Sequence, residues 1–113
     1  MTTVAAAERG ATRIADRVVA KIAAQAAREA LVTLPPDAMP PHASVVVHHD
    51  SARVRVSVEL DYPSDIGGQC HAVRRHVAQR VRTLAGMEVP EVAVQVERLH
   101  LAQAPGAAQG RTR

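Results

Sequence analysis

The sequence predicts a small α+β domain: a two-layer sandwich in which two helices cover one face of a single, mostly antiparallel sheet. Two observations lead to this prediction. In the middle of the chain and again near its carboxyl end, valines alternate with polar residues, which is the period of a half-buried strand. Before and between these stretches, apolar residues recur every three or four positions, which is the period of a helix. The expected order is helix, strand, strand, helix, strand, with a short leading strand as an option.

The first predicted helix covers about residues 16–31 and is followed by a proline-rich link. Its apolar positions follow helical spacing at Val18, Val19, Ile22, Ala26 and Ala30. Asp16 stands where a negative charge stabilises the amino end of a helix. Ahead of it we expect a short extended piece at Thr12–Ile14 and a flexible, Ala-rich segment at residues 1–11. The link at residues 34–42 contains four prolines, which remove amide donors and disfavour helix.

Two strands come next, at Ser44–His49 and Ala52–Asp61, joined by a tight turn at Asp50-Ser51. The second of these strands alternates cleanly. Its predicted buried side is Val54, Val56, Val58 and Leu60, and its predicted wet side is Arg53, Arg55, Ser57, Glu59 and Asp61. This period of two indicates a sheet with one face packed against the helices and the other face in water.

The second predicted helix has the clearest apolar stripe in the chain. Steps of three and four separate its members, which are Ile66, Cys70, Val73, Val77, Val81 and Leu84. Ser64 or Asp65 can cap the amino end, because both side chains accept hydrogen bonds from backbone amides. Gly86 is the expected stop residue.

The last predicted strand alternates at Val92, Val94 and Val96. Leu99 and Leu101 are out of phase with these valines, which indicates a β-bulge or an end to pairing near Arg98. Residues 102–113 are rich in Gly, Gln and Arg and are predicted to be a disordered tail. The domain is therefore expected to span residues 12–101.

Composition restricts the class of protein further. A chain of 113 residues fits one domain, and with one Tyr and no Phe or Trp its core must be aliphatic. Cys70 is the only cysteine, which excludes an intramolecular disulfide and fits a reducing compartment. Residues 1–13 lack the apolar run of a signal peptide, and no stretch approaches the roughly 18 apolar residues of a membrane span. We therefore expect a cytoplasmic protein, with a mild basic bias at a net charge of +3.

No constellation of catalytic or metal-binding residues stands out. Cys70 lies in the apolar stripe, where a small buried hydrophobe is expected and a hydrolytic nucleophile is the alternative. The histidines lack ligand spacing: His48-His49 are adjacent on a strand, and His71 and His76 are five apart on a helix. Gly67-Gly68 is not followed by the lysine of a phosphate loop. The sequence thus predicts a protein that is not an enzyme and uses no cofactor or metal.

The charge of the second helix is the remaining candidate feature. Its polar positions carry Arg74, Arg75, Arg80 and Arg82. These arginines are the candidate partner-binding face, for an acidic protein, phosphates or anionic headgroups, and an ordinary solvated surface is the alternative. The element order is also that of KH-type RNA-binding domains, so a small RNA-binding domain that uses these arginines is the alternative function. The Gly-x-x-Gly loop and the stacking aromatics of such domains are missing here.

Three segments, in order and at family-like spacing, carry a resemblance to a known family. Residues 10–27 (GATRIADRVVAKIAAQAA) are similar to the opening of the alkaline shock protein 23 family, also called the Gls-type envelope stress response family. Residues 52–66 (ARVRVSVELDYPSDI) resemble its Val-alternating strand, which ends in a tyrosine and leads to an Ile-led helix. Residues 77–100 (VAQRVRTLAGMEVPEVAVQVERLH) resemble its closing segment. The chain departs from the family at residues 28–41, where a proline-rich link replaces a shorter EVPGV sequence.

The resemblance implies a function without implying a catalytic site. Family members are non-enzymatic cytoplasmic proteins of bacteria that are linked to envelope or alkaline stress. Some are held at the membrane by a partner membrane protein, and some self-assemble. By resemblance, this chain is expected to be a scaffold or adaptor whose partner is a protein, such as a small membrane anchor protein or a second copy. No catalytic residues come with the family, so none are carried over.

Overall fold

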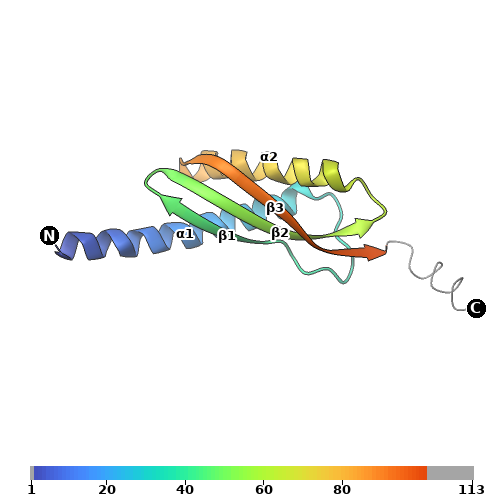
Figure 1. The fold of residues 1–113 in the computed structure, drawn as a ribbon, viewed down its shortest axis with the longest axis horizontal. Coiled ribbons are helices and arrows are strands. Elements are labelled where there is room, and N and C mark those ends of the chain that lie inside the picture. Colours follow the sequence, from blue (N-terminus) through green and yellow to red (C-terminus); the bar gives the residue numbers. More distant parts are fainter. Residues whose placement is uncertain (1, 102–113) are drawn as a thin grey trace, which may run out of the picture.

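The computed structural model describes the backbone of residues 2–101 and the side chains of residues 15–101. Within that range lie two helices, α1 (Thr2–Ala30) and α2 (Ile66–Ala85), and three strands, β1 (His42–His48), β2 (Ser51–Tyr62) and β3 (Glu88–Leu101). Both helices pack on one face of the sheet (Figure 1). The predicted α+β sandwich with the order helix, strand, strand, helix, strand is confirmed.

The sheet is mixed, with the strand order β1-β2-β3. β1 pairs with β2 antiparallel, so that Val45 lies opposite Val54. β3 pairs with β2 in parallel, so that Val92 lies beside the same Val54. The sheet was predicted to be mostly antiparallel, but only one of its two strand pairs, β1 with β2, is antiparallel. The second pair is parallel because α2 carries the chain back along the sheet, so that β3 starts at the same end as β2.

Helix α1 begins much earlier than predicted. Thr12–Ile14 is helical rather than a short strand, and residues 2–11, predicted as a flexible segment, belong to the same helix. The stretch is rich in Ala, the best helix former, and its amino-terminal part runs past the end of the sheet, where no strand is available for pairing (Figure 1). Asp16 consequently lies inside the helix and does not cap it. The predicted tail at 102–113 lies outside the described residues.

The core lies between the helices and the valine face of the sheet. On β2, Val54, Val56, Val58 and Leu60 are each at most 2% exposed, as predicted. They pack with Val73, Val77 and Val81 from α2 and with small residues of α1 such as Ala23, Ala26 and Ala27. Small alanines let α1 approach the sheet closely, which compensates for the missing aromatic side chains.

The opposite face of the sheet is only partly in water, which corrects the prediction for two residues. Arg53 and Arg55 are exposed, but Ser57 and Glu59 are each only 7% exposed. At Glu59 the proline-rich link reaches this face: the backbone N–H of Met39 donates to Glu59 Oε1 at 3.2 Å. A long connection thus covers one end of a sheet face that the alternating pattern alone assigns to solvent.

Local irregularities follow from identifiable residues. The hairpin turn is His49-Asp50, one residue earlier than predicted, and His49 has a positive φ of 58°. The predicted bulge in β3 is confirmed, because Val58 pairs with Val96 and Glu59 with Arg98, which leaves Glu97 without a partner on β2. The extra residue returns Leu99 to the side of the sheet that carries the valines, where it pairs with Leu60.

The ends of α2 match the sequence prediction. Asp65 is the N-cap, and its Oδ1 accepts a hydrogen bond from the Gly68 N–H at 3.0 Å. Gly86 ends the helix in the left-handed conformation, with φ of 65°. Of the predicted stripe, Val73, Val77 and Val81 are buried, and Ile66 and Cys70 are half-buried. Leu84 is 55% exposed, because it faces the outer side of α1 rather than the sheet.

Candidate functional site

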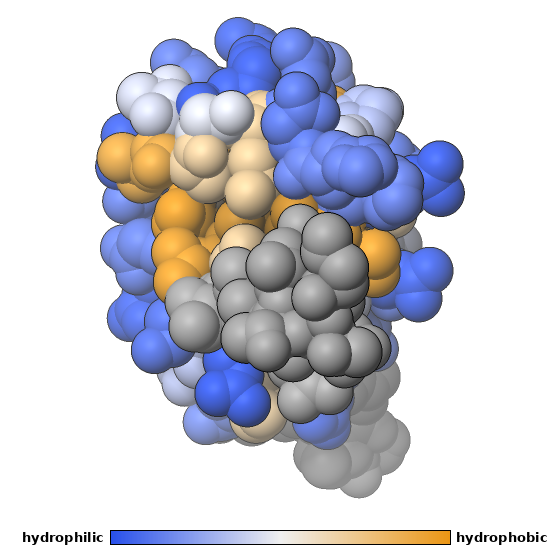
Figure 2. Space-filling view, turned by 90° about the vertical axis from the view of Figure 1, so that its left-hand side faces the viewer, coloured by the Kyte–Doolittle hydropathy of each residue, from blue (hydrophilic) through white to orange (hydrophobic). Residues whose placement is uncertain are grey.

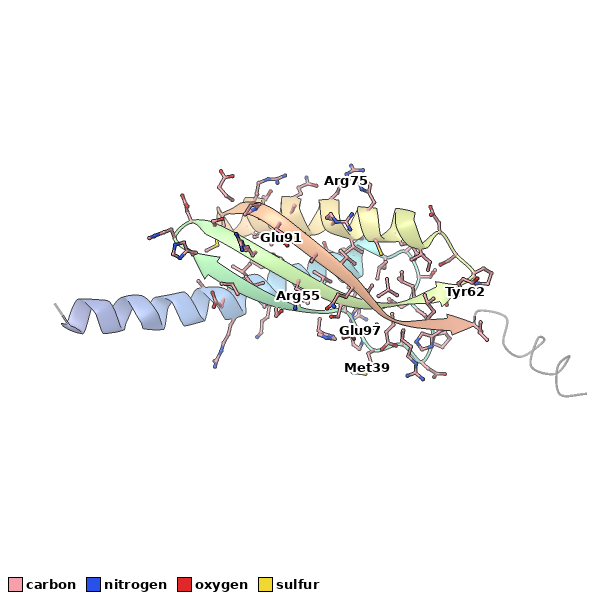
Figure 3. The ribbon with its side chains drawn as sticks, in the orientation of Figure 1. Met39, Arg55, Tyr62, Arg75, Glu91 and Glu97 are labelled. Carbon is pink, nitrogen blue, oxygen red and sulfur yellow. The ribbon has the colours of Figure 1, made fainter. Side chains whose placement is uncertain are left out.

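The four arginines predicted as one face of α2 do not lie together. The Arg74 Nε–H donates to the carbonyl oxygen of Val92, on edge strand β3, at 3.3 Å. Arg80 turns toward α1, where its Nε is 3.8 Å from Glu29 Oε1. Arg75 and Arg82 are exposed and seven positions apart, so they share the side of α2 that faces away from the core, and Figure 3 shows Arg75 on that side. Two arginines thus contact neighbouring elements of the fold, and two remain as a candidate binding surface.

Between the helices, Glu29 forms the centre of a charged cluster. His76 Nε2 lies 2.8 Å from Glu29 Oε1, and Arg80, one turn further along α2, approaches the same oxygen. The hydrogen bond from His76 is the main cause that lowers the pKa of Glu29, with a smaller contribution from the charge of Arg80. The sequence could not reveal this cluster, because Glu29 lies 47 positions before His76 and meets it only when α1 packs antiparallel to α2.

This cluster divides a groove on the outer side of the two helices into two hollows. We call the hollow on the amino-terminal side of Glu29 the interhelical groove; it has a volume of about 230 Å³ and is lined by Lys21, Ile22, Ala26, Arg80 and Leu84, among others. The second hollow, of about 260 Å³, is lined by small and polar residues that include Ala30, Ala72 and Arg75. The interhelical groove therefore combines an aliphatic floor with a charged rim, in which Lys21 and Arg80 stand with Glu29.

A third hollow, of about 340 Å³, lies on the open face of the sheet. Arg53 sits between Val46 on β1 and Glu91 on β3, and Arg55 sits between two small residues, Ser44 and Ala93. Figure 3 shows Arg55 and Glu91 along the sheet. Two arginines and one glutamate line this hollow, so its net charge is small and positive.

A second carboxylate–imidazole pair lies at the far end of the same sheet face. His100 Nε2 is 2.8 Å from Glu59 Oε1, and the Glu59 side chain is only 8% exposed. The hydrogen bond from His100 is the main cause that lowers the pKa of Glu59, and the Met39 N–H adds to the effect. The Glu59–His100 pair, together with the Met39 N–H, thus joins β2, β3 and the proline-rich link.

Cys70 has the environment of a packing residue. It is partly buried against the core, and burial raises the pKa of its thiol, opposed by a smaller effect of the Arg74 charge. A raised pKa lowers the thiolate fraction at neutral pH, which is the opposite of what a nucleophilic cysteine needs.

The remaining candidate ligands do not gather into a larger cluster within the described residues. Among the side chains of residues 15–101, no group of three or more His, Cys, Asp or Glu converges as metal ligands would. The expectation that His48 and His49 are adjacent residues of one strand is wrong: β1 ends at His48, His49 lies in the turn, and their ring centroids are 4.3 Å apart. At the start of α2, the Asp65 carboxylate occupies the position beside the Gly68 amide that a phosphate would need.

Comparison with known proteins assigns no family or function to this sequence. No protein-family model matches the sequence, and no curated protein matches it significantly. Neither α1 nor α2, within the described residues, has the length and apolar character needed to cross a membrane.

Proposed function

We propose that this protein is a non-enzymatic envelope or alkaline stress response protein that acts as a scaffold or adaptor through protein–protein contacts. The proposal is carried by the observation that close polar pairs connect elements of the fold, whereas exposed aliphatic side chains line a surface groove. The close carboxylate–imidazole pairs, Glu29–His76 and Glu59–His100, join elements of the fold to one another. Exposed aliphatic side chains such as Leu84 meanwhile line an open groove, as in a surface that binds a partner.

The sequence resemblance supports the cellular side of the proposal. The three matching segments fall on α1, on β2 with its following turn, and on α2 with β3, so they include most of the elements that form the core. By analogy with the resembled family, the protein acts in the cytoplasm of a bacterium and reaches the inner face of the membrane through a membrane-bound partner. Self-association is part of the same analogy.

Affinity capture from the membrane fraction of a stressed bacterial lysate tests this function. The tagged wild-type chain is expected to enrich a membrane or envelope protein over a tag-only control, and size-exclusion chromatography reports self-association. A variant with Arg75→Glu and Arg82→Glu tests the exposed arginines, and Arg53→Glu with Arg55→Glu on the sheet face is the charge-matched control. Capture of no envelope protein, together with a strictly monomeric profile, would contradict the proposal.

RNA binding is the second candidate, favoured by one observation: α2 contains no acidic residue, and Arg75 and Arg82 are exposed on its outer side. Such electrostatic binding weakens steeply with salt. A gel-shift assay with single-stranded and structured RNA at low and physiological salt decides the matter. Retention of RNA that is lost in the Arg75→Glu, Arg82→Glu variant supports this candidate, and no retention even at low salt eliminates it.

A further inference from the structure

We propose that the interhelical groove docks an amphipathic helix of a partner protein whose apolar stripe is flanked by acidic residues. The inference rests on the proposed adaptor function and assigns it a docking surface and a partner class. It also moves the binding surface away from the outer arginines of α2, toward the seam where α1 and α2 meet.

The apolar part of the groove is open and elongated. Its floor is formed by Ile22 and Ala26 from α1 and by Leu84 from α2, and Leu84 is 55% exposed. Val18, one turn before Ile22 on the same side of α1, is 49% exposed and extends the apolar surface. Figure 2, viewed from this end of the molecule, shows hydrophobic side chains gathered between hydrophilic regions of the surface.

The shape of the groove fits a helix. From Val18 to Glu29 the groove side of α1 runs for about three turns, or ~16 Å, which matches the contact length of a short helix. A third helix laid along the seam can insert the residues of its apolar stripe between α1 and α2, as helices do when they pack ridges into grooves. The Glu29–His76 bridge closes the groove at its far end and limits how far the partner extends.

The charges around the groove select the partner. Lys21 and Arg80 line the rim, and Arg17 is exposed on the outer side of α1. Glu29 is the acidic residue that lines the groove, and its carboxylate is already held by His76 and Arg80. Because Glu29 already pairs with Arg80, acidic flanks on the partner meet chiefly the exposed cations Lys21 and Arg17. A second copy docked through the same groove would bring like charges together, which disfavours self-docking at this site.

The test uses a labelled synthetic peptide of about 18 residues, or five helical turns. Leucines occupy positions i, i+3, i+4 and i+7, and glutamates flank the stripe; a twin peptide carries lysines in place of the glutamates. Fluorescence anisotropy with the full chain is expected to give binding of the acidic peptide that is about tenfold or more tighter than binding of the twin. Lys21→Glu, at an exposed position with no role in the core, should reduce this preference or reverse it.

Leu84→Glu should remove binding of the acidic peptide, because it places a charge on the apolar floor. The matched control is Val46→Glu, which alters an equally exposed aliphatic residue, 66% exposed, on the opposite face of the sheet. Circular dichroism verifies that both variants are folded. In ¹⁵N-labelled protein, the acidic peptide should shift the amide signals of residues 18–29 and 80–85 more than those of β1.

Equal binding of the two peptides, no binding of either, or equal losses in Leu84→Glu and Val46→Glu would each overturn the proposal. If the wild-type chain forms a concentration-dependent dimer that Leu84→Glu dissociates, the groove binds a second copy of the chain. This result would also overturn the proposal. The outcomes separate this inference from the proposed function. If a membrane protein is captured equally by wild type and Leu84→Glu, the groove assignment fails and the function stands. If the peptide binds as expected and no envelope protein is captured, the groove assignment stands and the proposed function fails.

Discussion

Two adjacent glycines at the start of α2 allow a sharp test of how this helix is held. Gly67 and Gly68 both lie in the first turn, yet their surroundings differ. A β-carbon on Gly67 would meet nothing within 4 Å, whereas one on Gly68 would lie 2.7 Å from Asp65 Cγ and would collide with the carboxylate. The same substitution by alanine is therefore expected to stabilise the protein at position 67 and not at position 68.

The magnitudes follow from two known effects. Replacing a glycine of compatible conformation by alanine stabilises a protein by about 0.4–1 kcal/mol, mainly by restricting the unfolded chain. Gly67→Ala should gain about this amount. Gly68→Ala gains the same entropy but displaces the Asp65 cap, whose loss costs about 1 kcal/mol. The two variants should thus differ by about 1 kcal/mol in unfolding free energy, or about 4–8 °C in Tm for a domain of this size.

Urea and thermal unfolding monitored by circular dichroism measure the difference. Asp65→Ala is the decisive background, because it removes both the cap and the collision. In that background Gly68→Ala should stabilise as much as Gly67→Ala does. If Gly68→Ala stabilises the wild-type chain as strongly as Gly67→Ala, the Asp65 side chain is not held beside the Gly68 amide and the reasoning is refuted.

Three further predictions concern the core, the hairpin and the charged clusters. Val77→Ala, at a fully buried position, should cost about 2–3 kcal/mol from lost burial and the cavity that remains; a urea midpoint unchanged from wild type would contradict this. His49→Gly should stabilise by about 1 kcal/mol, since glycine accepts the positive φ without strain; thermal unfolding tests it, and destabilisation would indicate that the imidazole has a structural role. Folding lowers the pKa of Glu29, so the ionised carboxylate stabilises the fold. This stabilisation is present above the ordinary pKa of 4.5 and is lost as pH falls through the folded-state pKa. Glu29→Gln should therefore be less stable than wild type near pH 7, and the difference should shrink below about pH 4.5; a difference independent of pH would show that the Glu29–His76 bond does not depend on the carboxylate charge.

Features set by near neighbours in the chain were predictable from the sequence. The alternation of β2, the apolar stripe of α2 and its two caps all depend on residues within a few positions of one another. The bulge near Arg98 also belongs to this group, because the phase change from Val96 to Leu99 is visible in the sequence. Cys70 lies against the core as its place in the stripe indicates.

Features set by contacts across the fold were not predictable. The period of β2 assigns Glu59 to water, but the proline-rich link reaches that face and buries it. The apolar stripe assigns Leu84 to the core, but Leu84 faces the outer side of α1. Asp16, expected to cap a helix, instead accepts a hydrogen bond from the Val47 N–H at 3.2 Å and so binds the edge strand β1.

The candidate site illustrates the same division. The sequence determined that α2 is a cationic helix with one apolar stripe, because both properties follow from helical spacing alone. Only the tertiary structure decided that Arg74 and Arg80 are bound to neighbouring elements, that Arg75 and Arg82 remain exposed, and that an aliphatic groove lies beside Lys21. The physical reason is that helical spacing fixes which residues of α2 share a face. Which of those faces stay in water depends on how α1 and β3 pack against the helix.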